Sequence, residues 1–351
     1  MIAPPIMPET LQTYRYERIL NPCPRIFSLL LLAILVLPPS SDAVVTAPTH
    51  KNKQESAPEY VGLGIFVRSI HNINYKDGTV AIDIFLYAET DKNSNPLETL
   101  EILNAEVKNK SNEGHIVVNG KHLFSERLDL LARVLYDLSA FPLDTQDLVL
   151  IFEDIAKDSK ALVFYGHPSS RIGKTVELPG YDILKHEVDI TVYEHIGGLR
   201  ALLHATPQGI PSTINYSRLT FRVPIERQGF VYYLKLFVSV FLAAAVAFLS
   251  FYIKPTNVDP RFGLGVAAIF AVVASNYVLS SILPDTHELS LGESVLFVTY
   301  VAIFVTLAMS VYSLHLYEAG KEGVAKRIDR AGGIVGPILY VAAMVALVLF
   351  L

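Results

Sequence analysis

The apolar segment 262–283 carries side chains at spacings of three and four, which place them on one face of a helix. These residues are Gly263, Ala267, Phe270, Ala274, Tyr277 and Ser281. In a symmetric assembly such a face could line a pore, with copies of Phe270 forming an apolar constriction that gates by dewetting. The alternative is a buried helix that packs closely through its small residues. The spacing alone favours this alternative.

Two charged residues precede this segment, Asp259 and Arg261. A ring of Asp259 carboxylates at the mouth of a pore would concentrate cations, as charged rings do in selectivity filters. The same acid would also be stabilised by the helix dipole, which gives it a purely structural interpretation. We expect Asp259 to favour cations if the segment lines a pore.

The segment is one of four apolar stretches that follow Arg227. Of the 351 residues, 51% are hydrophobic and only 18% are charged, which excludes a disordered chain and argues against a soluble protein. The stretches cover residues 230–253, 262–283, 295–317 and 334–351. Each is long enough, or nearly so, to cross a hydrocarbon core of about 30 Å. Because lipid offers the backbone no hydrogen-bond partners, each must be a helix.

Charged residues between the stretches indicate the orientation. The first and third connections carry the basic residues, which are Lys254, Arg261, Lys321, Lys326, Arg327 and Arg330. The second connection carries Asp285, Glu288 and Glu293 and has no Lys or Arg. Because basic loops stay in the cytoplasm, the region before residue 230 and the C-terminus are expected outside it.

The region before the four stretches begins with features of export. Residues 1–43 combine a basic start, an apolar core and small residues, which is typical of a signal peptide, with an uncleaved anchor as the alternative. Residues 44–59 have the composition of a linker. Between 60 and 228 short strands alternate with turns, and Asn119 and Gly120 mark a hairpin. The pattern predicts an all-β sandwich.

Several classes of protein are excluded. A net charge of −5 argues against a nucleic-acid partner, and Cys23 as the single cysteine excludes a disulfide framework and a cysteine metal site. His186 and His287 each precede a glutamate but lack the second histidine of a zinc-protease motif. We therefore expect neither an enzyme nor a bound cofactor or metal.

Five motifs, taken in order, resemble those of the pentameric ligand-gated ion channels, the Cys-loop receptor superfamily. Residues 141–146 are similar to its F-P-x-D-x-Q signature loop, and 216–234 to its last strand and the entry into the first helix. Residues 250–253 resemble the S-F-W-I end of that helix. Residues 261–266 resemble the R-V-G-L-G-I opening of the pore helix in the anion-conducting branch, and Leu283-Pro284 resembles its end.

The resemblance implies a homopentamer in the inner cell membrane. A ligand-binding β-sandwich at 60–228 would lie outside the cytoplasm, and a four-helix membrane domain would occupy 229–351. The chain lacks the two cysteines that bracket the signature loop in animal receptors, which fits the prokaryotic type. Phe270 falls at the family's hydrophobic gate position.

The resemblance also gives roles to residues at the junction of the two domains. Arg227 resembles the family's coupling arginine, and Asp144 in the membrane-facing signature loop is its expected partner. Pro142 and the loop that begins at Pro284 would form the other side of this junction. The alternative for Arg227 is an interfacial anchor.

By resemblance, the ligand would bind between subunits, with the loop 153–160 facing the loop 195–212 across the boundary. Neither loop contains an aromatic residue, and the chain has no tryptophan, so an aromatic cage for a quaternary amine is not expected. The candidate ligand-binding residues are Tyr193, His195 and His204. Because histidine titrates near neutral pH, the agonist could be a small molecule or the proton.

The sequence therefore predicts a ligand-gated ion channel subunit whose partners are copies of itself, the lipid bilayer, an agonist and permeating ions. Gly263 and Ala267 leave the inner part of the proposed pore apolar. For this reason a non-conducting membrane sensor or accessory protein on the same scaffold is the alternative.

Overall fold

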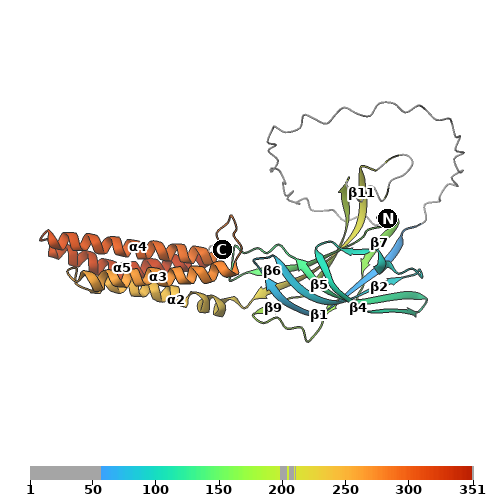
Figure 1. The fold of residues 1–351 in the computed structure, drawn as a ribbon, viewed down its shortest axis with the longest axis horizontal. Helices are drawn as coiled ribbons and strands as arrows, with labels where there is room; N and C mark the ends of the chain where they lie inside the picture. Colours follow the sequence, from blue (N-terminus) through green and yellow to red (C-terminus); the bar gives the residue numbers. More distant parts are fainter. Residues whose placement is uncertain (1–56, 198–203, 205–208, 210, 350–351) are drawn as a thin grey trace, which may run out of the picture. The chain divides into compact units, whose positions relative to one another are not determined.

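A computed structural model of the chain describes residues 57–197, 204, 209 and 211–349. The signal peptide expected at 1–43, and almost all of the linker expected at 44–59, lie outside the described residues. The strands come first along the chain and the long helices last (Figure 1). The predicted order, a β-sandwich followed by four apolar helices, is confirmed.

The β-sandwich consists of two sheets. In the first, the strand order is β4-β5-β2-β1-β7, and β8 also pairs with β1. Its strands are β1 (Glu59–Asn74), β2 (Thr79–Thr90), β4 (Ala105–Val118), β5 (Lys121–Arg133), β7 (Leu162–Gly166) and β8 (Arg171–Ile172). In the second, the order is β10-β11-β6-β3, and β9 also pairs with β11. Its strands are β3 (Leu100–Ile102), β6 (Thr145–Asp154), β9 (Tyr181–Ile183), β10 (Glu187–Ile196) and β11 (Thr213–Arg227).

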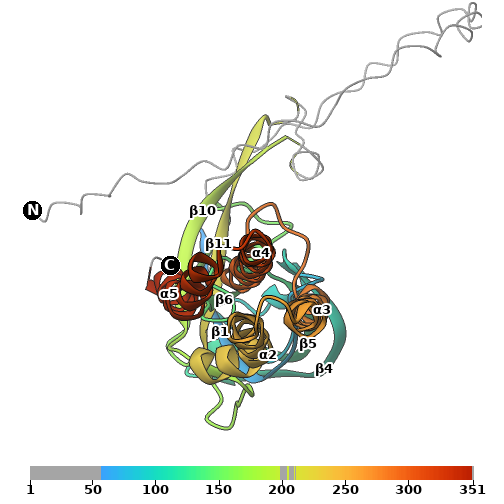
Figure 2. The same cartoon turned by 90° about the vertical axis from the view of Figure 1, so that its left-hand side faces the viewer.

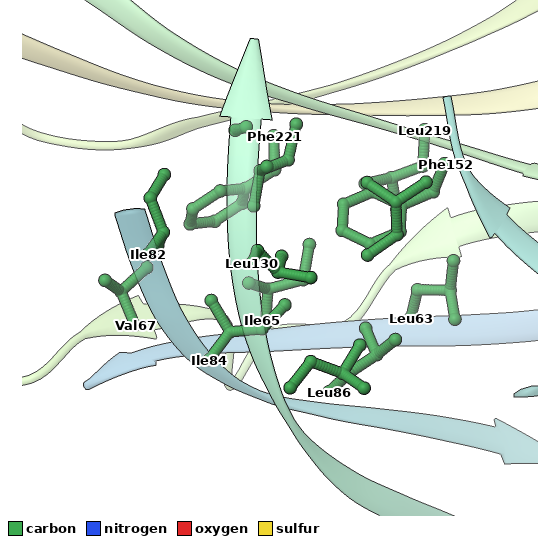
Figure 3. Close-up of a cluster of buried hydrophobic side chains, with 14 of the residues drawn as sticks. Leu63, Ile65, Val67, Ile82, Ile84, Leu86, Leu130, Phe152, Leu219 and Phe221 are labelled. Atoms are coloured by element: carbon green, nitrogen blue, oxygen red, sulfur yellow. The ribbon is translucent and has the colours of Figure 1, made fainter. Parts of the chain in front are cut away.

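The two sheets share one apolar core. Alternate residues of β2, from Val80 to Ala88, are buried, as the period of two predicts. Figure 3 shows side chains of β1 and β2, such as Ile65 and Ile84, in one cluster with Phe152 of β6 and Phe221 of β11. At the far end of the first sheet, Asn119 and Gly120 adopt positive φ angles of 53° and 81°, which form the hairpin turn between β4 and β5.

Four helices follow, each long and apolar enough to cross a membrane. They are α2 (Gly229–Leu249), α3 (Val258–Ile282), α4 (Leu291–Glu318) and α5 (Glu322–Leu349), and a short 3-10 turn, η2 (Ser250–Tyr252), extends α2. Seen end-on, the helices lie side by side (Figure 2), with α3 packed against α2 and α4, and α4 against α5. A capping box between Ser290 and Glu293 begins α4, because each side chain bonds the backbone of the other.

Helix α5 begins at Glu322, well before the apolar stretch expected at 334–351. The sequence prediction follows the apolar run and places the charged residues of this region in a loop. In the structure these residues form the first turns of the helix, and one of them, Asp329, is buried. Helix α3 likewise begins at Val258 rather than 262, so Asp259 and Arg261 lie in its first turn.

Substitution of a shared core residue should test the sandwich. Phe152→Ala should lower the free energy of unfolding by about 3–5 kcal/mol, because it leaves a cavity between the two sheets. Chemical denaturation in detergent, followed by circular dichroism, measures the change. Val117→Ala, on exposed β4, is the control and should shift stability by no more than about 0.5 kcal/mol. Equal losses of stability in Phe152→Ala and Val117→Ala would contradict a core shared by the two sheets.

Candidate functional site

Arg227 and Asp144 form a buried ion pair where the β-sandwich meets the helices. Arg227 is the last residue of β11, and Asp144 ends the loop between β5 and β6. Arg227 Nε donates to Asp144 Oδ1 at 2.8 Å, and the side chains are only 7% and 1% exposed. Burial disfavours the charged guanidinium, but the hydrogen bond to Asp144 and the charge interactions with Asp144, Tyr75 and Tyr181 together outweigh burial and raise the pKa of Arg227. The guanidinium therefore stays charged.

Four aromatic rings surround this guanidinium. Tyr75, Phe141, Tyr181 and Tyr232 have ring centroids between 4.7 and 5.4 Å from the guanidinium carbon of Arg227. Such rings attract a cation through their faces. Tyr75 Oη also accepts a hydrogen bond from Arg227 at 2.6 Å, and the hydroxyls of Tyr75 and Tyr181 bond each other. Burial raises the pKa of Tyr75 above its ordinary value, so the phenol stays neutral.

The loop that carries Asp144 contacts two of the helices directly. Leu291 N donates to Ser139 O at 2.8 Å, and Gly292 N donates to Phe141 O at 3.0 Å. A Cβ atom added at Gly229 would lie 2.8 Å from Leu143, so α2 begins against the same loop. The loop thus bridges the sandwich to the first residues of α2 and α4.

The structure brings three of the four predicted coupling residues together. Pro142 is buried in the same loop as Asp144, and Arg227 bonds that loop. Pro284 is half-buried after the end of α3, and the backbone hydrogen bonds from this loop to α4 go to Leu291 and Gly292, beyond Pro284. Sequence reasoning missed the tyrosines at 75 and 181, because each lies at a strand end and only the tertiary fold brings it to Arg227.

Helix α3 is strongly two-sided. Its buried side is formed by Arg261, Gly265, Ala268, Val272 and Leu279. The six residues predicted to face a pore are all exposed, with Phe270 at 70% and Tyr277 at 78%. Asp259 is exposed one helical turn before Gly263, on the same side. The helix therefore presents a continuous exposed side from an acid at one end to Ser281 near the other.

The predicted ligand-binding residues lie around a buried glutamate on the second sheet. Glu153, at the end of β6, accepts hydrogen bonds from Arg218 Nε at 2.7 Å and lies 2.9 Å from His195 Nε2. The guanidinium of Arg218 covers the ring of Tyr193, with 3.5 Å between its carbon and the ring centroid. His195 and His204 both pack edge-on against the ring of Tyr216.

This cluster brings the first residues of two predicted loops together. The loop that begins at Glu153 is expected to face the loop 195–212 across a subunit boundary, which stays a prediction, and within one chain Glu153 already bonds His195. The reason is the strand order, because β6 and β10 both pair with β11 and their ends lie on the same sheet. Glu153, Arg218 and Tyr216 were not predicted as site residues, since only this pairing brings them to Tyr193 and His195.

Comparison with known proteins gives relatives of one kind. The gamma-aminobutyric acid receptor subunit rho-3 of Rattus norvegicus is 25% identical over 218 residues, which are 62% of this chain and 44% of the relative. The subunit rho-1 of Homo sapiens is 24% identical over 224 residues, again 62% and 44%. The serotonin-gated chloride channel mod-1 of Caenorhabditis elegans is 24% identical over 155 residues, which are 44% and 28%. No family model matches the chain.

The chain spans less than half the length of the curated relatives it matches. These matches, together with the β-sandwich and the four apolar helices, confirm the resemblance to ligand-gated channel subunits. The chain is a multi-pass membrane protein, and its relatives are receptor and channel subunits rather than enzymes.

Removal of the carboxylate at Asp144 should destabilise the junction. Asp144→Asn should lower the free energy of unfolding by about 3–5 kcal/mol, because it leaves Arg227 buried without a counter-charge. Thermal unfolding in detergent measures the change. Asp147→Asn, which breaks an exposed 3.7 Å pair with Arg222, is the matched control and should have an effect of about 0–1 kcal/mol. An Asp144→Asn protein as stable as this control would show that the buried pair is not needed.

Proposed function

We propose that this chain is a subunit of a homopentameric ligand-gated ion channel, in which binding to the β-sandwich shifts a closed–open equilibrium of a pore lined by α3. The observation that carries the proposal is the exposed side of α3, which runs from Asp259 to Ser281. A side that faced lipid would carry large apolar residues throughout, because polar groups are unfavourable there. This side of α3 instead carries small residues, one phenylalanine and a polar outer end. Such a composition suits a face that lines a water-filled pore between copies of the chain.

Phe270 is the proposed gate. It is the largest purely apolar residue among the six pore-lining candidates, and it lies between the small residues Ala267 and Ala274. Copies of its ring around an axis would form a narrow apolar ring from which water is expelled, and this would stop ion flow without blocking the pore sterically. Ligand binding would open the ring by turning or tilting α3.

The proposed coupling path runs through the ion pair at the junction. Arg227 ends a strand of the ligand-binding sheet and is followed almost directly by α2, and Asp144 belongs to the loop that bonds the start of α4. As long as the buried pair stays intact, movement of the sheet therefore moves these helices. A pair enclosed in this way suits a two-state element that ligand binding biases, with Pro142 and the loop that begins at Pro284 as the proposed other side of the junction.

We propose that the ligand site lies at the subunit boundary beside Tyr193, His195 and His204. Arg218 already covers the ring of Tyr193, so a quaternary amine would have to displace a cation that also pairs with Glu153. This disfavours a quaternary amine and leaves a small molecule, or a proton at His195, as the agonist. The β-sandwich and the C-terminus would lie outside the cytoplasm, in keeping with the basic connections between the helices.

The pore is proposed to prefer cations, because Asp259 is exposed at the inner end of the pore-lining side. One relative is named a chloride channel, and an anion-selective pore is the competing possibility. The competing function, a non-conducting sensor, is favoured by the apolar inner face formed by Gly263 and Ala267.

Ion currents test the function directly. Purified protein in planar bilayers should conduct, and Phe270→Ala should leak or open more readily, because the apolar ring becomes wider and less effective at expelling water. Leu339→Ala, at an exposed position of α5, is the control and should conduct like the wild type. Silent bilayers for both wild type and Phe270→Ala, across ligands and pH, would instead support the sensor.

Reversal potentials in a salt gradient test selectivity. Asp259→Asn should lower the permeability of cations relative to anions several-fold, because the ring of carboxylates is lost. Glu318→Gln, at the same end of α4, removes an exposed charge that is not on the pore-lining side and should leave the ratio unchanged. An unchanged ratio in Asp259→Asn, or a wild-type preference for anions, contradicts cation selection by this residue.

A further inference from the structure

A second buried ion pair joins the inner end of α3 to α5. Arg261 is 0% exposed, and its guanidinium donates to both carboxylate oxygens of Asp329, at 2.5 and 3.1 Å. The same guanidinium also donates to the backbone oxygen of Ile253 at 3.0 Å. This two-pronged geometry is among the strongest that a guanidinium and a carboxylate can adopt. Arg261 is therefore fixed by groups from two other segments of the chain.

Close packing of α5 keeps Asp329 in this position. A Cβ atom added at Gly332 would lie 2.6 Å from the ring of Phe251, so the backbone of α5 touches η2 at this level. Tyr252 Oη donates to the backbone oxygen of Gly333 at 3.3 Å, which ties the same turn of α5 to η2. The carboxylate is thus held beside Arg261 by the contacts that dock the outer helix.

The pair determines which charge α3 presents. Asp259 and Arg261 are the two charged residues of α3, and they lie two positions apart in its first turn. Asp259 is exposed on the pore-lining side, whereas Arg261 is buried on the opposite side and neutralised. The exposed surface of α3 therefore carries negative charge alone. With a free Arg261 at the same end, each subunit would contribute a cation beside each carboxylate.

We infer that Asp329 is a specificity-determining residue of the channel, which acts by holding Arg261 away from the inner mouth of the pore and cancelling its charge. The inference rests on the proposed channel function. Without the carboxylate, Arg261 would be an uncompensated cation at the edge of the membrane, and such a charge moves to water. At the inner mouth the freed side chain would reach water beside Asp259, where its field would oppose the attraction of cations.

Reversal potentials of three variants test the inference. Asp329→Asn should lower the cation-to-anion permeability ratio several-fold, towards the value of Asp259→Asn, although Asp259 is intact. The double variant Arg261→Met with Asp329→Leu removes both charges and should keep the wild-type ratio, because no arginine is freed. Glu322→Gln, an exposed acid on the first turn of α5, is the matched control and should also keep it.

A purely structural pair gives a different pattern. In that case Asp329→Asn reduces assembly, measured by size-exclusion chromatography, while the channels that do form keep the wild-type ratio, and this result overturns the inference. If Asp329→Asn does not assemble, the double variant Arg261→Met with Asp329→Leu provides the test. Loss of the cation preference in this double variant also overturns the inference. A wild-type protein that never conducts contradicts the proposed function itself, whereas conduction with an unchanged ratio in Asp329→Asn contradicts only the inference.

Discussion

The arrangement of this protein depends on one buried cation. Arg227 lies where the second sheet continues into the helices, and its guanidinium is satisfied by Asp144 and by the faces of four aromatic rings. These partners come from four parts of the junction. Because a desolvated charge must keep its partners, the turn after β1, the loop before β6, strand β9 and the start of α2 are held in one fixed arrangement.

A buried arginine–aspartate pair lies at each end of the helical bundle, and the two pairs join different parts of the chain. At the end next to the sandwich, the Arg227–Asp144 pair lies where the sandwich meets the helices. At the opposite end, the Arg261–Asp329 pair lies within the bundle and ties α3 to α5. Beyond Arg261, the buried side of α3 is formed by small and apolar residues, so the Arg261–Asp329 pair fixes one end of this helix by charge.

Local patterns in the sequence predict much of the fold. The period of two in β2, the turn at Asn119 and Gly120, and the four apolar stretches are set by neighbouring residues, so each is visible without the tertiary structure. The beginning of α5 was not predicted, because the charges there are typical of a loop. Only the approach of Arg261, 68 residues away in the sequence, explains a buried acid in that turn.

The candidate sites divide in the same way. Asp144 and Arg227 could be predicted because they belong to sequence motifs, and the exposed side of α3 because it follows the helical period. The cluster around Glu153 could not, because its members come from three strands that meet only when the second sheet forms. Periodicity shows which face of an element is distinctive, whereas the partner of that face depends on the topology.

The position of β11 has a consequence for the order in which the chain is made. This strand is the last of the sandwich to leave the ribosome, yet it lies in the interior of its sheet, between β10 and β6. Asp144 is synthesised 83 residues before Arg227, so its counter-charge arrives only as the first membrane helix begins to emerge. The second sheet therefore gains its interior strand only after every other strand of the sandwich has been made, immediately before α2.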